Sequence, residues 1–116
     1  MSLSDRILAA DDIGKEIINV PQWNLDIEVR TMSAVQRSQM LQTSTLENGS
    51  VDLDRLYPML IIATVFDPET GARAFDKEDM VLLQEKSAAA IEFVAQKAMQ
   101  MSGMVAKSID DEGKDN

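Results

Sequence analysis

Carboxylates are the side chains with which this sequence could do chemistry. The chain has 20 aspartate and glutamate residues but no histidine and no cysteine. The absence of histidine removes the commonest general base and the imidazole metal ligands. The absence of cysteine removes thiol nucleophiles, disulfides and zinc ribbons. An enzyme would therefore have to use carboxylate, lysine or tyrosine groups.

Two close acidic pairs are the candidates for such a site. Asp52 and Asp54 lie at the start of an expected helix, and Asp11 and Asp12 follow a short one. Carboxylates at helix ends commonly cap free amides or interact with the helix dipole. We therefore predict no catalytic residue and rank an enzyme last among the candidate functions.

A third acidic pattern matches part of a calcium-binding loop. With Asp67 as the first position, Glu69 is third and Glu78 is twelfth, where such loops carry carboxylates. Gly71, however, is fifth instead of sixth, and Arg73 fills the seventh position. The glycine turn is therefore one position too early for a calcium loop, and the fifth position lacks a ligand side chain. We predict no metal ion and no cofactor.

These carboxylates lie on elements that surround one apolar run, PMLIIATVF, at residues 58–66. A run with so little polarity must be enclosed by other elements. Pro58 lacks an amide hydrogen, so the helix entering the run is predicted to kink or restart there. A buried strand is the alternative, but such a strand needs neighbours on both sides, and the sequence offers only two other strand candidates.

Those two candidates predict a β-hairpin at about residues 15–30. Apolar and polar side chains alternate over residues 25–30, and Pro21 supplies the bend. The side expected to face the core contains Leu25, Ile27 and Val29. Trp23, the only tryptophan, is then in or beside the hairpin loop.

Serine and aspartate residues mark the starts of the predicted helices. Ser4-Asp5 is expected to cap a helix over residues 6–10, and Ser33 a helix that extends to Thr45 and buries Val35, Met40 and Leu41. Ser50 or Asp52 is expected to cap the helix that enters the apolar run. Asp76 is expected to cap a helix that extends toward Ser87. An Asn-Gly turn is expected at residues 46–50.

The strongest helix pattern covers residues 88–101, and Gly103 is placed to end it. Its apolar stripe contains Ile91, Val94, Ala95, Ala98 and Met101. Phe93 and Met99 fall away from this stripe. They are either covered by the N-terminal segment or part of an exposed apolar surface.

We thus predict an α+β fold, mainly α, with a small hairpin packed on a compact group of four to five helices. Residues 1–104 are expected to form one domain. The acidic tail, residues 105–116, has little to bury and is expected to be disordered. The net charge of −9 is spread along the chain, which disfavours nucleic acid as a partner, and no segment is apolar enough to predict a membrane span.

The sequence resembles the tail assembly chaperones of long-tailed, siphovirus-type bacteriophages and prophages. The resemblance covers most of residues 1–104 and is carried by SLSDRILAADDI, VPQWNLDIEVR, LYPMLIIATVFDPETGARAF, DKED and EKSAAAIEFVAQKAMQMSGM. It implies a protein that binds the tape measure protein and keeps it soluble in the bacterial host cytoplasm until tail tube subunits polymerise around it. Such a chaperone is not expected in the mature virion.

The resemblance also implies a longer product, made by ribosomal frameshifting, that recruits tail tube protein. Glu112, Gly113 and Lys114 can be encoded GAG GGA AAG, which contains the slippery heptamer GGGAAAG. A homo-oligomer is a further expectation, since the hairpin has an edge able to pair with a neighbour.

No motif assigns the client-binding residues, so we predict them as apolar side chains that the core leaves exposed. The candidates are Trp23, Tyr57, Phe93 and Met99. Burial in the core is the alternative for each. The competing function is an acidic phage inhibitor or adaptor that mimics nucleic acid, which requires carboxylates gathered on one face. It ranks second, because here they are distributed.

Overall fold

The computed structural model describes residues 1–104, and the tail predicted to be disordered lies outside these residues. The fold is α+β and mainly α, as predicted. In chain order the elements are α1 (Leu3–Ala9), β1 (Lys15–Val20), β2 (Leu25–Arg30), α2 (Ala34–Ser44), α3 (Leu53–Thr64), β3 (Val65–Phe66), the 3-10 helix η1 (Lys77–Asp79), α4 (Met80–Gln84) and α5 (Ala88–Met101).

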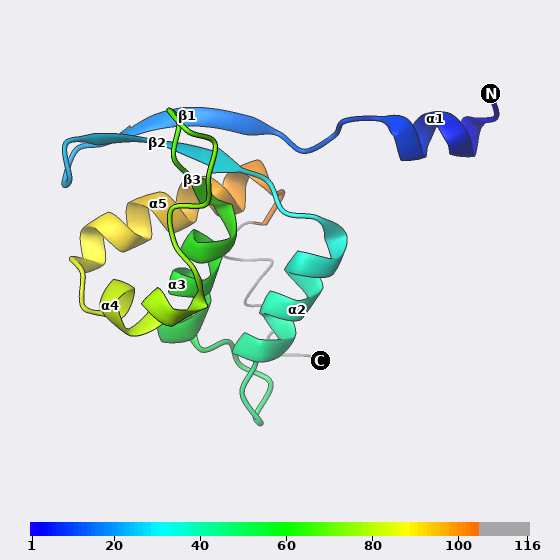
Figure 1. Ribbon diagram of the computed structural model, residues 1–116. Helices are drawn as coiled ribbons and strands as arrows, with labels where there is room; N and C mark the ends of the chain where they lie inside the picture. The colour runs from blue at the N-terminus through cyan, green and yellow to red at the C-terminus, as the bar shows by residue number, and fades with distance from the viewer. Residues whose placement is uncertain (105–116) are drawn as a thin grey trace.

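The predicted hairpin is confirmed as strands β1 and β2, which pair antiparallel. At its turn the Asn24 amide donates to the Val20 carbonyl, 2.8 Å away. A third strand, β3, was not predicted. It lies at the end of the apolar run, where Val65 pairs with Val29 to give a sheet of order β1-β2-β3. The sheet covers α5 and the end of α3 (Figure 1).

Most of the apolar run is helical, as predicted, but the helix does not restart at Pro58. Helix α3 continues through the proline from Leu53 to Thr64. The acceptor that Pro58 leaves free is the carbonyl of Asp54, four residues earlier. Gln84 of α4 donates its side-chain amide to that carbonyl at 3.0 Å. A donor from another helix therefore replaces the missing bond.

The predicted caps are largely confirmed. Ser33 and Asp76 each form a capping box, and the Asp52 side chain accepts from the Asp54 amide. Helix α1 is an exception, since its N-cap is Ser2 and not the predicted Ser4-Asp5; Asp5 completes the capping box from inside the helix. The predicted burial of Val35 is also wrong: it is exposed in the first turn of α2, which buries Met40.

Helix α5 has the predicted bounds and ends at Gly103 in a Schellman motif. Gly103 has a φ of 72°, and its amide donates to the carbonyl of Gln100 at 3.2 Å. The next amide, of Met104, donates to the carbonyl of Met99 at 2.6 Å. The chain thereby turns back, and Met104 is fully buried.

The core contains two clusters of buried side chains on either side of α3. One contains Val29, Met40, Leu56, Leu60, Ala95, Ala98, Met99 and Met104. The other contains Val20, Ile61, Val65, Leu83, Ile91 and Val94. Tyr57 and Ile27 pack against both, so the clusters are joined. Within residues 1–104, no helix has the length and apolar character that crossing a membrane requires.

Candidate apolar binding surface

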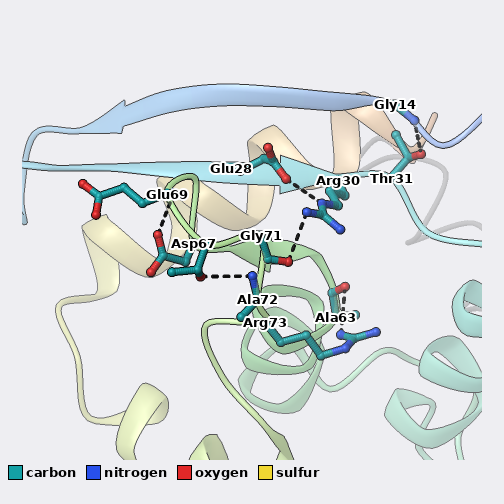
Figure 2. Close-up of polar contacts among 11 residues, drawn as sticks. Gly14, Glu28, Arg30, Thr31, Ala63, Asp67, Glu69, Gly71, Ala72 and Arg73 are labelled. Carbon is teal, nitrogen blue, oxygen red and sulfur yellow. Dashed lines mark hydrogen bonds and ion pairs between the residues drawn. The ribbon is translucent and has the colours of Figure 1, made fainter.

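Strand β2 is fixed to the turn that follows β3 by contacts of Arg30 (Figure 2). The guanidinium of Arg30 lies 3.8 Å from the centroid of the Phe66 ring, and its Nη2 donates to the Gly71 carbonyl at 3.3 Å. Glu28 forms an ion pair with the same guanidinium. These contacts hold the turn against the sheet. Phe75, shortly after the turn, packs on the second core cluster.

Asp67 and Gly71 of the calcium-like pattern shape this turn, whereas Glu78 lies in η1. The Asp67 carboxylate accepts a hydrogen bond from the Glu69 amide at 2.8 Å, and Gly71 has a φ of 76°, the left-handed conformation that favours glycine. In the part of the chain that the structure describes, no group of three or more acidic residues is arranged to hold a metal ion.

A mainly apolar cavity lies where the hairpin turn meets α4. We call it the tryptophan cavity; it has a volume of about 480 Å³ and is lined by Trp23, Leu25, Phe75, Asp79, Leu82, Leu83 and Lys86. Trp23 is half-buried against the second core cluster. Leu25 and Leu82 are 59% and 63% exposed. The cavity thus has a buried wall and a rim of leucines open to solvent.

Two further cavities are linked to the tryptophan cavity by shared lining residues, one directly and the other through the first of them. Tyr57 lines one of about 550 Å³ that shares Leu83 and Lys86 with the tryptophan cavity. Phe93 lines another of about 470 Å³ that shares Glu92 with the cavity of Tyr57. Shared residues therefore link the three cavities along α4 and α5, and we call them the series.

Three of the four predicted contact residues, Trp23, Tyr57 and Phe93, lie in this series, each half-buried. Met99 does not. It is 3% exposed and belongs to the first core cluster, because that cluster extends round α5 beyond the predicted stripe. Met99 therefore offers no surface to a partner.

Sequence reasoning missed Leu25 and Leu82. Leu25 was expected to face the core, but it lies at the turn end of β2, beyond the helices that cover the rest of the strand. Leu82 follows Met80 and Val81 in an apolar row on a five-residue helix. A helix cannot bury all of its faces against one core, so this row was the signal that could have revealed an exposed leucine.

The acidic pairs act at helix ends or lie in solvent. Asp52 caps α3, and Asp11 and Asp12 are exposed in the segment before β1. The tryptophan cavity can bind apolar side chains. The other two cavities are more polar. The charged residues that line the series are Asp54, Asp79, Lys86, Glu92 and Lys97.

Comparison with known proteins gives a likeness of fold. No protein-family model matches the chain, and no curated protein sequence matches it. Among solved structures, the chain is similar to one described as the bacteriophage HK97 tail assembly chaperone, with a TM-score of 0.60 and 16% sequence identity. The match covers 87% of this chain and 95% of that one. At this identity the likeness shows the fold, which is that of a phage tail assembly chaperone.

Proposed function

We propose that this protein is a tail assembly chaperone of a long-tailed phage or prophage. It binds the tape measure protein in the host cytoplasm, keeps that client soluble before the tail tube forms, and does not remain in the virion. Two observations support this proposal: the fold likeness, and the solvent-open leucines beside Trp23 in the tryptophan cavity.

The chemistry of the surface suits a long helical client. An amphipathic helix is able to place apolar side chains in the tryptophan cavity and polar side chains over the more polar cavities of Tyr57 and Phe93, while a net charge of −9 keeps the complex dissolved. Each cavity is open and offers modest contact area. Several copies bound along one client provide avidity without tight single contacts.

Co-expression tests this proposal. A candidate tape measure protein with a long helical sequence is produced with and without the chain, and its soluble fraction is measured. We expect the wild-type chain to raise that fraction and Leu82→Ser to abolish the gain. Val81→Ser is the matched control, because Val81 is 61% exposed on the same helix but lines none of the cavities described above.

Failure of the wild-type chain to raise client solubility, with both proteins well expressed, would count against the assignment. Equal effects of Leu82→Ser and Val81→Ser would place the contact elsewhere on the molecule.

A longer frameshifted form that recruits tail tube protein is part of the same proposal. Its sequence support is the Glu112-Gly113-Lys114 triplet, which lies outside the described residues. The gene sequence tests it directly: GAG GGA AAG permits slippage at this site, whereas GAA for the glutamate, or GGC or GGT for the glycine, excludes it.

A further inference from the structure

Helix α1 is not buried against the rest of residues 1–104. None of its residues is buried, and Leu3 and Ile7 are 65% and 61% exposed. These two side chains are four positions apart and therefore lie on one face of the helix. A seven-residue helix is marginal in water without tertiary packing, even with a capping box such as that of Ser2 and Asp5. The helix therefore needs a surface to cover Leu3 and Ile7.

The segment that joins α1 to β1 places α1 away from the rest of residues 1–104. Gly14 is held to Thr31 by two hydrogen bonds of 2.9 Å, one from the Gly14 amide to the Thr31 hydroxyl and one from the Thr31 amide to the Gly14 carbonyl. From this point residues 10–14 extend outward, and α1 stands at the end, beyond α2 (Figure 1). We call residues 1–14 the arm.

A groove on the body matches the arm in polarity. It lies between α2, α3 and the start of α4, has a volume of about 600 Å³, and contains three methionines. We call it the methionine groove; its lining residues of interest are Met40, Met59, Ile62, Met80, Arg55, Arg73 and Lys77. Flexible thioether side chains adapt well to an inserted helix face. At about 1.5 Å per residue, α1 is about 10 Å long, which suits a groove of this size.

Charge makes this groove unlike the others described for residues 1–104. Three cations and no carboxylate line it, whereas each of the three cavities described above has at least one carboxylate. Arg73 is held in place, because its Nη1 donates to the Ile62 carbonyl at 3.3 Å. The arm carries three acidic side chains, Asp5, Asp11 and Asp12, and one basic side chain, Arg6. An acidic arm with an apolar helix face complements a cationic groove with an apolar lining.

We infer that α1 of one copy docks in the methionine groove of a second copy. Arm and groove are different surfaces, so each copy is able to give an arm to one neighbour and receive one from another. Such a head-to-tail contact builds a ring or an open filament. The inference does not rest on the proposed client, and its test contains no client.

The test is sedimentation velocity on the full chain and on two variants. The arm variant, Leu3→Ser with Ile7→Ser, removes the apolar face of α1. The groove variant, Arg55→Glu with Lys77→Glu, reverses charge at the groove. All four positions are exposed, so the fold should be kept, and circular dichroism checks it. Lys15→Glu with Lys114→Glu controls for net charge, and Val35→Ser controls for an exposed apolar residue outside the groove.

We expect the wild-type chain and both controls to assemble, and each test variant to sediment as a single chain of 12.8 kDa. An equimolar mixture of the two variants should form a two-chain complex, because one supplies an intact groove and the other an intact arm. The inference is overturned if the wild-type chain is a monomer at every concentration, if either variant still assembles, or if the mixture does not associate.

Discussion

Gln84 donates its side-chain amide to the main-chain carbonyl of Asp54 at 3.0 Å, and this carbonyl is the acceptor that Pro58 leaves without an amide in its own helix. The bond joins α4 to α3 beside the cavity of Tyr57, which Asp54, Pro58 and Gln84 also line. It explains how α3 passes through a proline and why α4, only five residues long, keeps its position.

This relationship predicts a coupling between Gln84 and Pro58. Gln84→Ala should lower the free energy of unfolding by about 1 kcal/mol, since the carbonyl loses its protein donor. In a Pro58→Ala background the same change should cost less, because the new amide at position 58 donates to Asp54. Urea unfolding of the four proteins in the double-mutant cycle measures the coupling. An equal cost in both backgrounds would show that the side chain does not compensate for the proline.

The stacking of Arg30 on Phe66 predicts that lysine cannot replace this arginine. Arg30→Lys keeps the charge but loses the planar guanidinium over the ring, and should lower the free energy of unfolding by about 1 kcal/mol. Arg6→Lys, in the exposed α1, serves as the control and should have no measurable effect. Equal stability of the two variants would mean that the stack does not hold the turn after β3.

The burial of Met99 predicts an effect on stability and not on the binding surface. Met99→Ala should lower the free energy of unfolding by about 2 to 5 kcal/mol, as expected for truncating a buried methionine. Val81→Ala, at an exposed position, should change it by less than about 0.5 kcal/mol. Denaturant unfolding checks both. Unchanged stability together with lost client binding in Met99→Ala would return this residue to the contact surface.

Features set by local chemistry were predictable from the sequence. Ser33, Asp52 and Asp76 cap helices because their side chains accept hydrogen bonds from amides two or three residues ahead, and such spacing is visible in the chain. The hairpin followed from alternation over residues 25–30, and the end of α5 from Gly103.

Features set by distant partners were not predictable. The continuity of α3 depends on Gln84, 30 residues from Asp54. Strand β3 has only two residues and exists because Val65 meets Val29 of the hairpin. Val35 shows the same limit for the surface: helical periodicity predicted it to be buried, but it is exposed, because periodicity does not reveal which neighbouring elements cover a helix. For Met99 the periodicity left burial and exposure open, and its contacts in the first core cluster decide for burial.

The central claim is that the tryptophan cavity binds the apolar face of a helical client. Trp23 is the only tryptophan and lines this cavity, so its fluorescence reports directly on occupancy. Helical segments of the tape measure candidate are titrated into the purified wild-type chain, Leu82→Ser and Val81→Ser. We predict a saturable blue shift of Trp23 emission with the wild type and Val81→Ser, and at least a tenfold weaker affinity for Leu82→Ser, about 1.4 kcal/mol. No spectral change and no binding with any segment, or the same affinity in all three proteins, would contradict the claim.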